Sequence, residues 1–169
     1  LSQAAGAAHG GAIGFYNSKS GINSILDSVF ESNSAWGGSA DFGASAFAGN
    51  AFGGAIYLGP RSRLNRIGAS KFIGNSAQAF DGVLDQNSGK AFGGALSLEG
   101  AELGIIESST FDANEAVAGN NIAISNDDSL ARGGALSFVA AANIPAICYA
   151  SYDTTYSNNS VIAENNGQG

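Results

Sequence analysis

Gly93-Gly94-Ala95-Leu96 is one of four near-identical tetrapeptides that recur along this chain of 169 residues. Each copy reads Gly-Gly-Ala followed by Ile or Leu, and the first glycines are 43, 40 and 40 residues apart. A fixed period in this range is typical of a repeat architecture. The other copies are Gly10-Gly11-Ala12-Ile13, Gly53-Gly54-Ala55-Ile56 and Gly133-Gly134-Ala135-Leu136.

A second motif, Phe-x-x-Asn, alternates with the first at about half of its period. If each motif marks one turn of the chain, the structural unit is roughly 20 residues long, and about eight units fit in the sequence. We therefore expect two kinds of coil in strict alternation. The copies of the second motif are Phe30/Asn33, Phe72/Asn75, Phe111/Asn114 and a degenerate Tyr156/Asn159.

The residues that follow each glycine pair alternate in character. Ile56 and Leu58 are apolar, and Tyr57 between them is expected to point to the opposite face. This period of two predicts a strand with one buried side. The same alternation recurs at Ile13/Gly14/Phe15, Leu96/Ser97/Leu98 and Leu136/Ser137/Phe138.

The second motif predicts a bend and a turn. Ile25 and Phe30 are five residues apart, so both are buried only if the chain bends between them, and Ser28 is a natural place. Asn33 suits a left-handed turn. The four asparagines are expected to form an amide ladder along the stack, and the aromatic residues a column in every second coil.

Together these patterns predict an all-β chain folded as a parallel β-solenoid. We expect a single domain over 1–169, with a lead-in at 1–8, repeats at 9–159 and a polar tail or cap at 160–169. The segments between the motifs, 34–52, 76–92 and 115–132, are the variable part and are expected to contain the loops.

Composition narrows the classes of partner. Only 12% of the residues are charged, and the net charge of −7 argues against nucleic acid or an anionic membrane surface as the ligand. No apolar run approaches the roughly 18 residues that a transmembrane helix needs. The lack of methionine indicates a processed chain or a piece of a longer one. The single cysteine, Cys148, is expected to be a small buried hydrophobe.

The alternation of Gly-Gly-Ala-(Ile/Leu) with Phe-x-x-Asn over residues 9–159 resembles the repeats of the chlamydial polymorphic outer membrane proteins. Such repeats also occur in bacterial and algal surface or secreted proteins. The resemblance implies a right-handed β-helix, export to the cell surface or the extracellular space, and an adhesive role. A sequon at Asn158-Asn159-Ser160 is a possible glycosylation site in a secreted protein.

No recognisable catalytic constellation is present, so we expect a protein that is not an enzyme and binds no cofactor or metal. His9 is the only histidine and is expected to be an ordinary polar turn residue. The Arg61, Arg63 and Arg66 cluster is expected to be a solvated loop rather than an anion site. Asp112 and Glu115 flank the third Phe-x-x-Asn, but no acid occupies those places in all repeats, so they do not indicate a catalytic site. Asp127-Asp128 is expected to be solvated loop charge. Asp81, Asp85 and Asn87 could be imagined as calcium ligands, but their spacing matches no known calcium motif.

A solenoid has two open ends that must be capped, continued or used. We therefore expect a structural or adhesive scaffold that contacts protein partners or further copies of itself through its ends and variable loops. The alternative is a carbohydrate-active or polysaccharide-binding β-helix. A row of exposed aromatic side chains would favour glycan binding, and the candidates for it are Tyr16, Trp36 and Tyr57.

Overall fold

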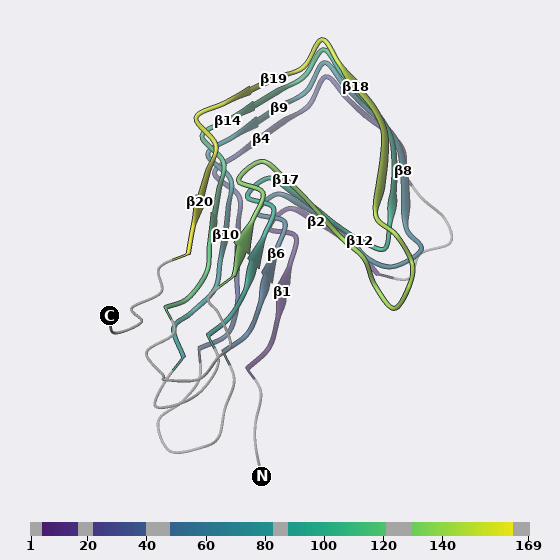
Figure 1. Cartoon of the computed structure of the whole chain (residues 1–169). Helices are drawn as coiled ribbons and strands as arrows, with labels where there is room; N and C mark the ends of the chain where they lie inside the picture. The colour runs from purple at the N-terminus through teal and green to yellow at the C-terminus, as the bar shows by residue number, and fades with distance from the viewer. Residues whose placement is uncertain (1–4, 17–21, 40–47, 83–87, 121–129, 164–169) are drawn as a thin grey trace.

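The computed structural model describes residues 5–16, 22–39, 48–82, 88–120 and 130–163. Across these ranges the chain forms twenty short strands and no helix. Five consecutive strands make one coil, and the four coils overlie one another when viewed along the stack (Figure 1). The all-β solenoid expected from the sequence is confirmed.

The strands of the four coils have these bounds. The first coil comprises β1 (Ala8–His9), β2 (Ile13–Phe15), β3 (Ile22–Leu26), β4 (Val29–Glu31) and β5 (Ser34–Trp36). The second comprises β6 (Ala51–Phe52), β7 (Ile56–Leu58), β8 (Arg63–Gly68), β9 (Lys71–Ile73) and β10 (Ser76–Gln78). The third comprises β11 (Ala91–Phe92), β12 (Leu96–Glu99), β13 (Glu102–Glu107), β14 (Thr110–Asp112) and β15 (Glu115–Val117). The fourth comprises β16 (Ala131–Arg132), β17 (Leu136–Val139), β18 (Ile147–Tyr152), β19 (Thr155–Ser157) and β20 (Ser160–Ile162).

Equivalent strands of successive coils pair in parallel and form five sheets of four strands. We name them by the position of the strand in the coil. Sheet A is β1-β6-β11-β16, sheet B is β2-β7-β12-β17, and sheet C is β3-β8-β13-β18. Sheet D is β4-β9-β14-β19, and sheet E is β5-β10-β15-β20.

The strand register corrects the predicted coil length. Ile56 lies opposite Leu96, and Phe72 lies opposite Phe111, so each motif stacks on the next copy of the same motif. Both motifs therefore belong to one coil of roughly 40 residues, and the prediction of about eight coils of 20 residues is wrong. Coils of half that length would have placed phenylalanine over glycine and separated the asparagines of neighbouring turns.

Three groups of buried side chains hold the coils together. The largest comes from sheets B, C and D and includes Phe72 and Phe111. A second consists only of alanines in or next to the strands of sheets A and E, among them Ala51 and Ala77. These small side chains let the two sheets lie close together. The third is aromatic and comprises Phe52, Tyr57 and Phe92 from sheets A and B.

The glycine pairs combine a turn with a close contact. The first glycine takes the left-handed conformation, as at Gly53 with φ 63°. The second allows close approach, because a Cβ on Gly94 would lie 2.0 Å from the carbonyl oxygen of Gly134 in the next coil. The glycines of the first motif therefore serve as turn and packing residues.

The predicted turn at the motif asparagines is wrong in detail. The residue before each asparagine is left-handed instead, such as Ala113 with φ 52° before Asn114. The bend expected at Ser28 likewise centres one residue earlier, on Asp27 with φ 48°. The asparagine is used for its side chain rather than for its tolerance of an unusual backbone.

Candidate functional site

The four motif asparagines form a continuous hydrogen-bonded ladder, as predicted. Asn33 donates from its backbone N–H and its Nδ2 to Oδ1 of Asn75, at 3.0 and 2.9 Å. Asn75 donates in the same way to Asn114, and Asn114 donates to Asn159. Nδ2 of each of the last three also donates to a backbone carbonyl of the preceding coil. The side-chain ladder therefore runs in one direction, from the first coil to the fourth.

The ladder is unfinished at both ends of the stack. Within the described ranges, Oδ1 of Asn33 accepts no hydrogen bond, and the backbone N–H of Asn159 donates none. The two inner asparagines, Asn75 and Asn114, are fully buried and complete. One end of the molecule thus offers an acceptor and the other a donor, in matching positions.

The aromatic residues of the second motif form a stacked column with one ring in every coil, rather than in every second coil. Successive ring centroids are 4.8, 4.6 and 5.1 Å apart, with interplanar angles of 4°, 1° and 14°. Phe72 and Phe111 are completely buried, whereas Tyr156 at the end of the column is 44% exposed. Phe30 at the other end is only partly buried.

Two end faces follow from these columns. The C-terminal end face comprises Phe138, Tyr156 and Val161, which belong to inward-facing columns but are 41%, 44% and 48% exposed. Their partners in the third coil, Leu98, Phe111 and Ala116, are fully buried. The N-terminal end face comprises Ile13, Phe15 and Phe30, which are partly buried at the first coil. Phe15 and Phe30 begin the columns that end at Phe138 and Tyr156, and Ile13 begins the column that ends at Leu136.

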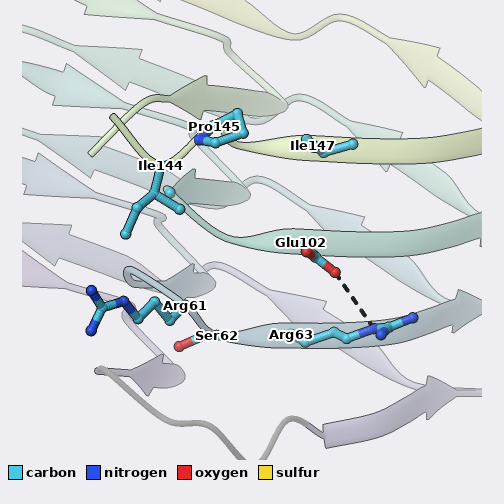
Figure 2. Close-up of a pocket in the computed structure, with 8 residues that line it drawn as sticks. Arg61, Ser62, Arg63, Glu102, Ile144, Pro145 and Ile147 are labelled. Atoms are coloured by element: carbon cyan, nitrogen blue, oxygen red, sulfur yellow. Dashed lines mark ion pairs between the residues drawn. The ribbon is translucent and has the colours of Figure 1, made fainter. Parts of the chain in front are cut away.

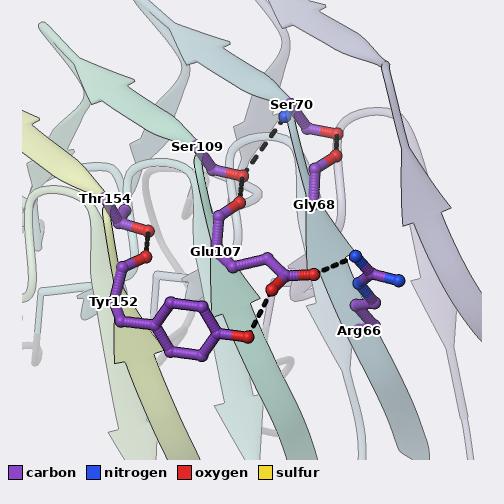
Figure 3. Close-up of polar contacts among 7 residues, drawn as sticks. All are labelled: Arg66, Gly68, Ser70, Glu107, Ser109, Tyr152 and Thr154. Atoms are coloured by element: carbon purple, nitrogen blue, oxygen red, sulfur yellow. Dashed lines mark hydrogen bonds and ion pairs between the residues drawn. The ribbon is translucent and has the colours of Figure 1, made fainter.

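The outer side of sheet C carries a polar network across three coils (Figure 3). Glu107 accepts a hydrogen bond from the hydroxyl of Tyr152 and forms an ion pair with Arg66. The hydrogen bond from Tyr152 is the main reason that the pKa of Glu107 lies below its usual value, and the ion pair with Arg66 lowers it further. The same hydrogen bond raises the pKa of Tyr152. Beside it, the N–H of Ser70 donates to Oγ of Ser109 at 3.2 Å. The network ties neighbouring coils together.

An aromatic cluster covers the outer side of sheets A and B. His9 is stacked on Phe52 at 4.8 Å and lies edge-on to Tyr57 at 4.5 Å. The hydroxyl of Tyr57 donates to Glu99 at 2.6 Å. Burial lowers the pKa of His9 and, with that hydrogen bond, raises the pKa of Tyr57. The prediction of His9 as a polar turn residue is wrong, because it lies in β1 and packs into this cluster.

The three aromatic residues considered for glycan binding do not form a row. Tyr57 is 1% exposed, so both faces of β7 are buried and the expectation of one buried side is wrong there. Tyr16 and Trp36 are 57% and 55% exposed. Tyr16 lies beside Tyr57, whereas Trp36 ends β5 and packs against Phe80 at 6.0 Å.

The only cysteine and one sequon residue have defined surroundings. Cys148 is half-buried against the main core, and burial raises the pKa of its thiol. Nδ2 of Asn158 donates to Asp112 at 2.9 Å, and Ser157 donates to the same carboxylate. These hydrogen bonds lower the pKa of Asp112. The atom that a glycan would modify is therefore engaged in a contact between coils.

The other acidic candidates also make contacts between coils where the structure describes them. Oδ1 of Asp81 accepts a hydrogen bond from the N–H of Asn120 at 2.7 Å, and Glu115 accepts one from Ser160 at 3.1 Å. Asp85, Asn87 and Asp127-Asp128 lie outside the described residues. Over the described ranges, no group of three or more His, Cys, Asp or Glu residues is placed to hold a metal ion.

A corner pocket lies where sheet B turns into sheet C (Figure 2). It has a volume of about 310 Å³ and spans the second to the fourth coil. Arg63 forms a 3.8 Å ion pair with Glu102 in its wall. The predicted arginine loop is thus partly a strand, since Arg63 and Arg66 lie in β8. The lining residues are Arg61, Ser62, Arg63, Gly100, Glu102, Ile144, Pro145 and Ile147.

None of the known protein-family models matches the chain. Comparisons with curated proteins and with solved structures likewise return no match. In the described part of the chain there is no helix with the length and hydrophobicity that crossing a membrane requires.

Proposed function

We propose that this chain is a non-catalytic structural β-helix whose open ends join it to other proteins, above all to further copies of itself. The observation that carries this proposal is the exposure of core columns at the ends. Val161 is 48% exposed, whereas Ala116 and Ala77 in the same column are fully buried. A coil placed over the C-terminal end face would bury this column as the inner coils already do.

The two end faces are suited to each other. Continuing the stack would place Tyr156 over Phe30 of the next copy and Leu136 over Ile13. These pairs have the same chemistry as the pairs inside the chain. The unused N–H of Asn159 would meet the unused Oδ1 of Asn33. Such a contact joins different surfaces of identical chains, so it is heterologous and extends into a filament.

The motifs support a more specific setting. Their resemblance to polymorphic outer membrane protein-type repeats favours an exported or cell-surface protein with an adhesive role. Right-handed coiling is expected, because crossovers between parallel strands are right-handed in about 98% of cases. A rod of stacked coils with few charged residues suits a scaffold or a subunit of a larger assembly.

The alternative function is a carbohydrate-active or polysaccharide-binding β-helix. The observation in its favour is the exposure of Tyr16 and Trp36, since exposed aromatic rings provide stacking surfaces for sugars. Affinity electrophoresis in gels that contain acidic or neutral polysaccharides tests it. Retardation of the wild-type chain that is lost in both Tyr16→Ala and Trp36→Ala would favour this function over the structural one.

Sedimentation velocity over a range of concentrations tests the self-association. We expect the wild-type chain to form species larger than the monomer, and Val161→Lys to remain monomeric because it puts a charge on the end face. Ile162→Lys is the matched control, since it is the next residue of β20 and faces outward. A wild-type chain that stays monomeric at every concentration contradicts self-association, as does equal behaviour of the two variants.

A further inference from the structure

The corner pocket depends on the connection between β17 and β18 in the fourth coil. Between β17 and β18 the chain uses residues 140–146, whereas the third coil turns from β12 to β13 through 100–101. The longer connection forms a tight turn, in which Ala141 and Ile144 exchange backbone hydrogen bonds of 3.0 and 2.7 Å. Ala142 and Asn143 at its tip are both left-handed, with φ 42° and 69°. The connection is therefore a defined structure.

This connection packs against the third coil. A Cβ on Gly100 would lie 2.9 Å from Cβ of Ala141 and 3.3 Å from Cβ of Ile144, so glycine permits the close approach. As a result, Ile144 and Pro145 form an apolar wall above the turn that carries Arg61 (Figure 2). Three coils thus contribute to one pocket.

The polar side of the pocket has two groups that find no side-chain partner among the described residues. Ser62 is 2% exposed, and its hydroxyl makes no hydrogen bond within the described structure. Such a buried hydroxyl is costly unless a ligand or water satisfies it. Arg61 is exposed and forms no ion pair with any described residue. The hydroxyls of Ser88 and Ser97 are also unpaired, but neither lines this pocket.

The charges around the pocket favour an anion. Arg63 is neutralised by Glu102, which leaves the guanidinium of Arg61 as the uncompensated charge of the lining. A guanidinium matches a carboxylate because its planar fork can donate two parallel hydrogen bonds. The wall of Ile144 and Pro145 selects for an apolar group next to that carboxylate.

We propose that the corner pocket binds a small organic carboxylate. The carboxylate is held by the guanidinium of Arg61 and, once the buried hydroxyl of Ser62 rotates towards the pocket, accepts a hydrogen bond from it. The apolar body of the ligand packs against Ile144 and Pro145. A volume of about 310 Å³ admits a molecule about as large as an amino acid or an aromatic acid. This site is separate from the end faces, so it goes beyond the proposed scaffold function.

Ligand-observed NMR with benzoate as the probe tests the proposal, because it works for single chains and for stacks alike. We expect saturable binding of benzoate, at least about tenfold weaker binding of the uncharged isostere benzamide, and weaker binding of inorganic phosphate, which lacks an apolar body. Arg61→Gln should weaken benzoate binding about tenfold. Arg132→Gln, which removes an exposed arginine outside the pocket, should leave it unchanged.

Two further variants test the planar fork of the Arg61 guanidinium and the hydrogen bond from the Ser62 hydroxyl. Arg61→Lys keeps the charge but loses the planar fork, and should fall between the wild type and Arg61→Gln. Ser62→Ala should weaken benzoate binding about threefold, which corresponds to one hydrogen bond. Equal binding of benzoate and benzamide, or unchanged benzoate binding in Arg61→Gln, would overturn the proposal. Thermal unfolding of each variant without ligand verifies that the fold is intact.

Discussion

The second and third coils are closed on both sides, while the first and fourth repeat the same motifs but are open on one side. Phe72 and Phe111 are completely buried, yet Tyr156 in the equivalent place is 44% exposed. The comparison shows that a coil of this chain is completed by its neighbours rather than by its own residues. This is the behaviour of a one-dimensional repeat protein.

Exposed apolar side chains follow the same division. Among the described residues, every large apolar or aromatic side chain that is exposed, except Phe80, belongs to the first or the fourth coil. Equivalent substitutions should therefore cost more free energy of unfolding in the inner coils than at the ends. If a substitution in an inner coil and its equivalent in an end coil cost the same free energy of unfolding, this expectation is wrong.

The largest effect is expected from adding one methyl group to an inner glycine. In Gly94→Ala the new Cβ would lie 2.0 Å from the carbonyl oxygen of Gly134 and 2.3 Å from the N of Glu115, so backbone on two sides must move. We expect a loss of at least about 4 kcal/mol in urea unfolding. Gly6→Ala is the control, because nothing lies within 4 Å of its Cβ, and its stability should be close to wild type.

Removing a ring from the aromatic column should give the next largest effect. Phe72→Ala leaves a cavity between two stacked rings and should cost about 3–5 kcal/mol. Phe30→Ala, at the partly exposed end of the column, should cost about half as much. Urea midpoints with equal m-values provide the comparison. Equal losses would mean that the first coil is covered in solution, which sedimentation of the same samples would reveal.

The asparagine ladder allows the same comparison between an inner position and an end position, with a smaller expected loss of stability. Asn75→Ala removes the acceptor for two donors of Asn33 and should cost about 2–3 kcal/mol. Asn33→Ala, at the open end, should cost about 1 kcal/mol. Hydrogen exchange should show faster exchange of the backbone N–H of Asn33 in the Asn75→Ala variant, because Asn75 Oδ1 accepts its hydrogen bond. Unchanged protection of that amide would contradict the ladder.

The smallest effect concerns pH and the first coil. Because burial lowers the pKa of His9 in the folded state, the unfolded chain binds more protons once the pH falls towards the ordinary value of about 6.5. Stability should therefore be complete above that value and decrease as the pH is lowered through it. His9→Phe should remove this decrease between pH 7.5 and 5.5. An identical pH profile for both proteins would show that His9 is not responsible.

The sequence predicted the solenoid, the amide ladder and the aromatic column because stacked positions repeat the same residue type. It did not predict the coil length. The two motifs alternate at about half of the repeat period, and each was interpreted as marking a coil of its own. One signal was available: an amide ladder needs asparagine over asparagine, and that is met only when Asn75 lies next to Asn114 in the stack.

The corner pocket had no periodic signal to reveal it. Its apolar wall comes from residues 140–146, a connection that is longer than its equivalents in the second and third coils. The arginines around position 61 were noticeable in the sequence, but the partner surface lies about 80 residues further along the chain. Only the stacking of coils brings these segments together. The burial of His9 and Tyr57 was hidden for the same reason, because Phe52 and Glu99 belong to other strands.

The direction of the asparagine ladder gives the rod an electrical polarity. The Oδ1 of each inner side-chain amide faces the preceding coil and one of its N–H groups faces the next, so the amide dipoles add instead of cancelling, and each one polarises its neighbour. The Asn33 end is therefore slightly negative and the Asn159 end slightly positive. Two copies that met by the same end would bring like partial charges together. An assembly of this protein should consequently have a single sense along its whole length, without a twofold axis across it.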